Sequence, residues 1–151
     1  MGENPNALRA VVWAGFACGV LDITAALVVY GFFGAKPVPL LQGIASGLLG
    51  PKAFQGGFAT ALLGLLCHFL IAFGAATVYF VASRAVPIIE HAVVFGVLYG
   101  VAVYFFMNRI VLPLSAAAKR PFSMKFMIIG VVIHIFCVGL PISLSMRRFS
   151  R

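Results

Sequence analysis

Three titratable side chains stand in the middle of long apolar stretches of this sequence, where a charge is costly to hold. Asp22, His68 and His134 each fall near the centre of one stretch. A carboxylate and two imidazoles at one depth can hydrogen-bond to one another, exchange protons near neutral pH, or supply ligands to a metal or haem iron. The sequence therefore leaves three interpretations open: a structural polar cluster, a proton or ion path, and a metal- or haem-binding site.

The three cysteines accompany these residues. Cys18 precedes Asp22 by four residues and Cys137 follows His134 by three, so each is expected on the same helix face as its neighbour. Cys67 directly precedes the histidine of its own stretch. No pair has the CxxC or CxxCH spacing of a redox or haem-attachment motif. We expect the cysteines to be small buried apolar residues, with a ligand role as the alternative.

The composition predicts the elements that carry these residues. Of 151 residues, 63% are hydrophobic and 9% are charged, whereas a typical soluble domain has about 45–50% and about 25%. The charged residues divide the chain into four apolar stretches, and each can supply the roughly 20 residues of a transmembrane helix. The predicted spans are about 8–33, 57–82, 90–112 and 124–146. This composition excludes a soluble enzyme, a disordered chain and a nucleic-acid-binding domain.

The predicted fold is an all-α polytopic integral membrane protein, in which residues 1–151 form a single transmembrane domain of four helices in a bundle. Residues 34–56 are the longest connection, and the apolar residues between its prolines predict a short helix that is interfacial or re-entrant. In an up-and-down bundle the second and fourth spans lie diagonally across the axis. That arrangement would allow both midplane histidines to face Asp22.

Paired motifs indicate an internal repeat. The first and third spans each contain two glycines four residues apart: Gly15 and Gly19, and Gly96 and Gly100. A Gly-x-x-x-His step also occurs in both even-numbered spans, ending at each midplane histidine. Small residues four apart allow helix backbones to approach closely, so the four glycines are predicted to be helix-packing positions. The sequence thus favours two similar helical hairpins in the same orientation.

Two polar residues, Asn108 and Arg109, lie near the end of the third span. Arg109 is expected to extend to the lipid headgroups, and pairing with an acid such as Asp22 is the alternative. The lysines and arginines are almost evenly divided between the two sides of the membrane. The arginine cluster after residue 146 favours both termini in the cytoplasm.

The run HAVVFGVLYGVAVYFFMNRIVLPLSA, from His91 to Ala116, resembles a family of four-span bacterial inner-membrane proteins similar to YagU. The resemblance extends over most of the second to fourth spans. It implies location in the bacterial inner (plasma) membrane. It implies no cofactor and no site residue, because those proteins have no established biochemical activity.

Three classes of function follow from these observations, in order of preference. The first is a small membrane protein of structural or accessory type, embedded in lipid as a homo-oligomer or as a subunit of a larger complex. The second is a proton- or ion-coupled small transporter or channel that uses the midplane residues. The third is a membrane redox protein that binds haem b or a transition metal. Enzymatic hydrolysis and a nucleic-acid partner are not expected, because the chain has only three acidic residues and lacks nucleotide and protease motifs.

Overall fold

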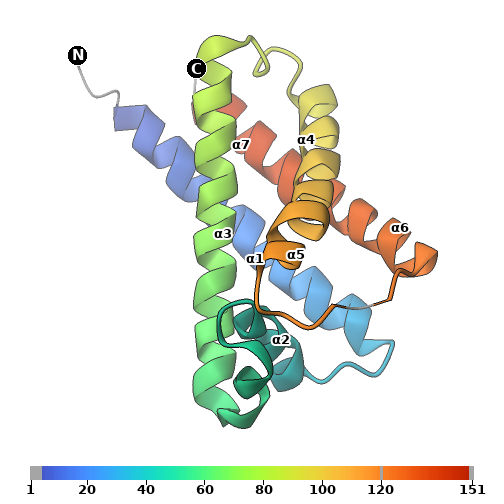
Figure 1. The fold of residues 1–151 in the computed structure, drawn as a ribbon. Coiled ribbons are helices and arrows are strands. Elements are labelled where there is room, and N and C mark those ends of the chain that lie inside the picture. The colour runs from blue at the N-terminus through green and yellow to red at the C-terminus, as the bar shows by residue number, and fades with distance from the viewer. Residues whose placement is uncertain (1–4, 120, 150–151) are drawn as a thin grey trace.

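The computed structural model describes residues 5–119 and 121–149 (Figure 1). It confirms the predicted fold class, because the described chain is helical and four of its helices are long and apolar enough to cross a membrane. These spans are Ala7–Gly31, Gly57–Ala85, Ala92–Leu114 and Met124–Phe149.

Two of the four spans contain a π-helical segment. In chain order the elements are α1 (Pro5–Gly31), α2 (Pro37–Leu49), the 3-10 helix η1 (Gly50–Gln55), α3 (Gly57–Ala85), α4 (Ala92–Phe106), the π segment η2 (Met107–Val111), α5 (Leu112–Leu114), α6 (Met124–Ile133), the π segment η3 (His134–Gly139) and α7 (Leu140–Phe149). The third span therefore joins α4, η2 and α5, and the fourth joins α6, η3 and α7. Such π segments are rare in proteins, and those that occur are often found at functional sites.

Glycine and proline set the boundaries around the first connection. α1 ends shortly before Gly34, whose φ of +86° is a conformation that favours glycine. Pro37 stands in the first turn of α2, where a backbone N–H would have no hydrogen-bond acceptor within the helix, so its absence costs nothing. Gly57, with φ of +57°, begins α3. These residues separate three helices within a short stretch of chain.

The spans are arranged as two hairpins that meet at α1. Figure 1 shows α1 and the fourth span running side by side, with α3 and α4 crossing them. α3 packs on α1, and α4 packs on the fourth span. Although α3 and α4 are consecutive spans, their backbones have little contact within the described part of the chain. α3 and α4 instead contact each other through side chains, as where the Tyr79 and Tyr99 rings pack edge to face with centroids 5.0 Å apart.

The two hairpins pack in the same register. In each hairpin, the two glycines of the odd-numbered span lie against two positions of the even-numbered span that are one turn apart. The contacts are Gly15 with Phe73 and Gly19 with Phe69 in the first hairpin, and Gly96 with Gly139 and Gly100 with Ile135 in the second. Corresponding residues are 81 apart in the odd spans (Gly15 and Gly96) and 66 apart in the even spans (Phe73 and Gly139). These are also the offsets of the repeated sequence motifs, so the repeat in the sequence is a repeat of the helix packing.

The interior of the bundle is narrow and rich in small residues. Its main cluster of buried residues is Ala10, Ala14, Cys18, Ala72, Ala76, Tyr79, Ile88, Val138, Ile142 and Met146. Many larger apolar side chains are exposed on the outside of the spans, as at Leu70, which is 63% exposed. This distribution is expected in a lipid bilayer. Burying an apolar side chain there gains little free energy, because the lipid tails are equally apolar, and the helices associate through close packing instead.

α2 lies against the first turns of α3, at the end of the bundle opposite the described chain ends (Figure 1). The buried Gln42 side chain donates hydrogen bonds to the Gly57 carbonyl at 2.8 Å and to the Thr60 hydroxyl at 3.2 Å. Further along, Gly64 of α3 faces the carbonyl of Leu41. The third connection joins this end too, since the Ala116 N–H donates to the Gly47 carbonyl at 2.9 Å. The connections between spans one and two and between spans three and four therefore form one layer.

Candidate functional site

Asp22 lies on α1 and is partly buried. Its carboxylate interacts electrostatically with the thiol of Cys18, one turn earlier, and with that of Cys137 on η3. No described residue gives this carboxylate a hydrogen bond or an ion pair. The electrostatic interactions of Asp22 within the described residues are thus with thiols, which do not neutralise its charge.

His68 connects the two spans of the first hairpin. Its Nε2 atom lies 2.9 Å from the carbonyl oxygen of Gly19 on α1. A carbonyl oxygen only accepts hydrogen bonds, so Nε2 carries the proton and donates it. The ring also meets the neighbouring Phe69 ring edge to face, with centroids 5.7 Å apart. His68 therefore holds α3 against the close-packed glycine of α1.

His134 stands at the junction of α6 and η3 and bonds within its own span. Its Nδ1 atom donates to the Gly130 carbonyl at 2.9 Å. Its ring packs edge to face on Tyr104 of α4, with centroids 5.3 Å apart. One turn beyond, the Asn108 side chain donates to the Tyr104 carbonyl at 2.9 Å, at the start of η2. Asn108 and His134 thus accompany the two π segments.

The structure therefore separates the sequence-predicted residues into three environments. Asp22 lies with Cys18 and Cys137, while each midplane histidine is held by a backbone carbonyl. Cys67 is half-buried and free. Over the residues that the structure describes, no group of three or more His, Cys, Asp or Glu side chains is placed to hold a metal ion.

We expect His68→Leu to destabilise the bundle more than His134→Leu. The first substitution removes a hydrogen bond between two spans, which is worth about 0.6–1.7 kcal/mol in membranes. The second removes a bond within one helix and leaves the α4 contact with the fourth span largely apolar. A thermal unfolding curve in detergent, read with a thiol-reactive fluorogenic dye, measures both variants, because Cys18 is buried in the folded state. Equal melting temperatures for the two variants would contradict the assigned role of His68.

A buried polar network that the sequence did not indicate links three of the spans. Ser143 of α7 donates to the Ala92 carbonyl at 2.6 Å, and its hydroxyl oxygen lies 2.7 Å from that of Tyr79 on α3. Since the serine proton is used on Ala92, the tyrosine is the donor in the second bond. Tyr79 and Ser143 are 1% and 0% exposed. The signal in the sequence is Ser143 itself, a polar residue near the end of the last apolar span, whose hydroxyl requires an internal partner when it is buried.

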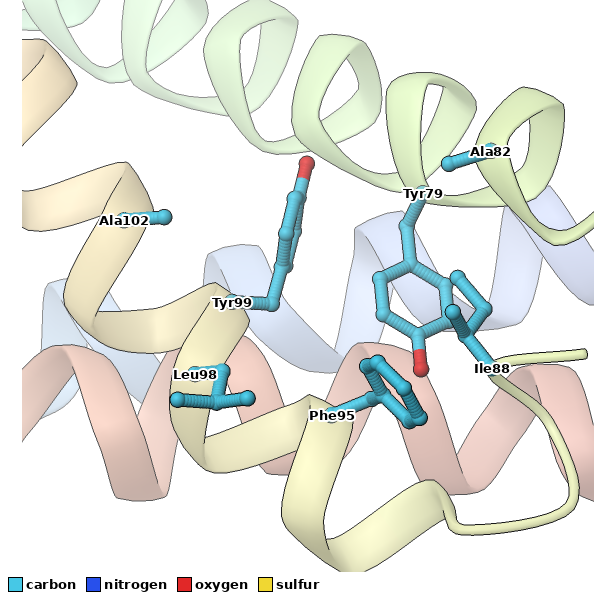
Figure 2. A pocket seen from close by; sticks show the side chains of 7 residues that line it. All are labelled: Tyr79, Ala82, Ile88, Phe95, Leu98, Tyr99 and Ala102. Atoms are coloured by element: carbon cyan, nitrogen blue, oxygen red, sulfur yellow. The ribbon is translucent and has the colours of Figure 1, made fainter. Parts of the chain in front are cut away.

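A groove of about 260 Å³ opens between α3 and α4, above this network (Figure 2). It is lined by Tyr79, Ala82, Ile88, Phe95, Leu98, Tyr99 and Ala102. Figure 2 shows the Tyr99 hydroxyl directed to α3, where it donates to the Ala75 carbonyl at 2.6 Å. The Tyr79 hydroxyl is engaged by Ser143. The groove therefore presents carbon surface and can accommodate an apolar chain such as a lipid tail.

Of the lysines and arginines within the four spans, Arg109 lies furthest from a span end, and no described residue supplies it with a counter-ion. It lies on η2 and is exposed, and it interacts electrostatically with Tyr104 one turn earlier. In the described part of the chain it has no ion pair with Asp22 or Glu90. Asp22 and Arg109 are thus opposite charges that the single chain leaves apart.

No protein-family model, curated protein or solved structure matches this chain. The likeness to YagU-type proteins stays a prediction from the sequence.

Proposed function

We propose that this protein is a structural or accessory membrane protein that assembles with a partner inside the bilayer. The observation that carries the proposal is Asp22, a carboxylate within a span that has no hydrogen bond or ion pair from the described residues. The proposed location is the bacterial plasma membrane with both termini in the cytoplasm. Arg147 and Arg148, in the last turn of α7, support this orientation.

The position of Asp22 makes a missing partner costly. The first span is Ala7–Gly31, so its centre is residue 19 and Asp22 is three residues beyond it. At a rise of about 1.5 Å per residue, the carboxylate is about 4.5 Å from the centre of the span. An acidic residue at the centre of a transmembrane helix costs about 2.5–3.5 kcal/mol on insertion scales. A partner that supplies a donor or a cation to Asp22 would recover much of this free energy.

The positions of the histidines favour assembly over a proton path. A relay requires titratable groups within hydrogen-bond reach of one another or joined through water. Here His68 donates to Gly19 and His134 donates to Gly130, so both imidazoles have structural partners. Asp22 is the member of the predicted cluster whose charge lacks one.

The proposal is tested by the mass of the purified assembly. The variant Asp22→Asn and the matched control Thr24→Val, an exposed polar residue two positions along the same helix, are extracted in a mild detergent with the wild type. We expect light scattering after size exclusion to give an assembly heavier than one 16.1 kDa chain for the wild type and the control. Asp22→Asn should run as a single chain.

Two results would overturn the proposal. One is an unchanged assembly mass for Asp22→Asn. The other is a proton flux in proteoliposomes that is lost in Asp22→Asn while the mass stays the same, which would assign the carboxylate to transport instead.

A further inference from the structure

We propose that the end of the bundle formed by α2 and the third connection binds a phospholipid with a net negative charge. Its phosphate lies between Lys52 and Lys119, and its acyl chain covers exposed leucines beside them. We call this site the α2 corner: it consists of Leu48 and Leu49 at the end of α2, Leu114 at the end of α5, and the two lysines. This inference does not depend on Asp22 and goes beyond the proposed function.

α2 turns its polar residues inward and its apolar residues outward. Its two polar side chains, Gln42 and Ser46, are 4% and 5% exposed. In contrast, Leu48 is 68% exposed and Leu49 is 41% exposed. A helix on the surface of a protein in water has the opposite arrangement. The outer face of α2 therefore requires an apolar environment, which the acyl chains of the bilayer supply.

The depth of α2 agrees with this environment. Gly64 is seven residues from the centre of the second span, Gly57–Ala85, which is about 10.5 Å along the helix. The hydrocarbon core of a bilayer extends about 15 Å from its centre. A Cβ at Gly64 would meet the Leu41 carbonyl, so this part of α2 lies at a depth within the core. The depth favours the re-entrant prediction for α2 over the interfacial one.

The other end of α2 meets the third connection at the edge of the hydrocarbon core. Leu114 ends the third span, eleven residues from its centre, which is about 16.5 Å. Just beyond it the Ala116 N–H donates to the Gly47 carbonyl at 2.9 Å, and a Cβ at Gly50 would lie 3.5 Å from the Ala116 carbonyl oxygen. Figure 1 shows the third connection passing α2 at this end of the bundle. The leucines of the α2 corner thus lie where acyl chains give way to headgroups.

The two lysines follow this backbone contact directly. Lys52 is two residues after Gly50 and Lys119 is three residues after Ala116, and both are exposed. A chain extends by no more than about 3.6 Å per residue, so the Cα atoms of the two lysines lie within about 7 Å and about 11 Å of the contact. A lysine near the edge of the core extends its ammonium group to the headgroups. Both ammonium groups can therefore reach a phosphate above the exposed leucines.

No acidic side chain in the described part of the chain opposes these lysines. The acids there are Asp22, within α1, and Glu90, in the connection at the opposite end of the bundle. A zwitterionic headgroup brings its own cation, which two lysines repel, whereas an anionic headgroup has a net charge that they attract. The charge of the α2 corner therefore favours an anionic phospholipid over a zwitterionic one.

Quenching of tryptophan by brominated lipids tests the site in the full chain. The sequence has one tryptophan, Trp13, which is replaced by phenylalanine, and Leu114→Trp places a reporter at a position that is 83% exposed. The protein is reconstituted in phosphatidylcholine vesicles that contain either chain-brominated phosphatidylglycerol or chain-brominated phosphatidylcholine. We expect at least about a fivefold preference of the reporter site for phosphatidylglycerol, which is the effect of one lysine near an anionic headgroup. Lys52→Gln combined with Lys119→Gln should abolish the preference.

Two control variants carry the same reporter. Lys52→Arg combined with Lys119→Arg keeps both charges and should keep the preference. Lys125→Gln removes a cation at the same end of the bundle, whose Nζ atom instead lies 4.3 Å from the centre of the Phe33 ring, and should also keep it. The site is refuted if the reporter shows no preference between the two lipids. It is equally refuted if Lys125→Gln lowers the preference as much as the double glutamine variant, because the lysines would then act only as a diffuse surface charge.

A second reporter tests the placement of α2 without any change to the lysines. In the same Trp13→Phe background, Leu48→Trp should be quenched strongly by brominated acyl chains and weakly by acrylamide in the aqueous phase. Strong quenching by acrylamide without quenching by the brominated chains would place this face of α2 in water and would overturn the proposal.

Discussion

Replacing Gly139 with alanine should lower the free energy of unfolding by about 3 kcal/mol, because the new methyl group meets backbone atoms that cannot move aside. A Cβ at this position would overlap the Gly96 carbonyl and lie 2.5 Å and 2.8 Å from the N and Cα atoms of Gly100. The fourth span would have to separate from α4 along the contact that holds the second hairpin together. In a chain of this length the melting temperature should fall by about 6–12 °C.

The matched control is Gly74→Ala, on the outer face of α3. Nothing lies within 4 Å of the methyl group there, and alanine is favoured over glycine in a helix by about 0.8–1.0 kcal/mol. This variant should melt at or above the wild-type temperature. The dye-based unfolding curve reports both variants, and a Gly139→Ala protein as stable as Gly74→Ala would show that the second hairpin does not pack as described.

Removing the hydroxyl of Ser143 should be the most damaging change in the polar network. Ser143→Ala leaves the buried Tyr79 hydroxyl without a partner and removes the second hydrogen bond to the Ala92 carbonyl, which keeps its bond within α4. We expect a loss of about 2–3 kcal/mol. Tyr79→Phe removes only the outer donor, because the Ser143 proton stays on Ala92, and should cost about 1 kcal/mol.

The double variant distinguishes this network from simple loss of packing. Ser143→Ala combined with Tyr79→Phe should be no less stable than Ser143→Ala alone, since the tyrosine hydroxyl is no longer stranded. Ser145→Ala, two residues along α7 and without a hydrogen bond in the described chain, is the control and should behave like the wild type. Costs that simply add in the double variant would argue against a coupled pair.

The sequence predicts the depth of a side chain in this fold better than its direction. Charged residues mark where each span ends, and the predicted spans differ from the observed ones by only a few residues. The helix-face rule also holds on α1, where Cys18 and Asp22 interact one turn apart. The depth of a residue and its helix face are enough to predict its neighbours when the helix is regular, with 3.6 residues per turn.

The same rule is unreliable in the fourth span, because a π segment begins at His134. A turn with i→i+5 hydrogen bonds accommodates more residues than an α-turn, so the α-helical count does not decide which residues share a face with His134. Cys137 interacts with Asp22, whereas His134 packs on Tyr104. The apolar sequence does not indicate such a segment, since an α-helical stretch and a π-helical stretch have nearly the same hydropathy.

The hydrogen bonds of Tyr79 and Ser143 could not be predicted from the sequence for a related reason. Tyr79 lies on the inner face of α3, and its hydroxyl crosses to Ser143 of the fourth span. A tyrosine within a span can equally extend to the membrane interface, and only the packing of α7 against the rest of the bundle decides between the two. That packing depends on helix tilt, which the length and composition of a span do not determine.

The pairing of consecutive spans has a consequence for the order in which the protein assembles during synthesis. α1 contacts α3, and α4 contacts the fourth span, so each hairpin can form its glycine contacts as soon as its own second helix is in the membrane. Domains generally assemble from the N-terminus while the ribosome is still translating. The first hairpin then stands in the bilayer with one side of α1 uncovered. This side of α1 is covered only after the fourth span has been made and docks against the first.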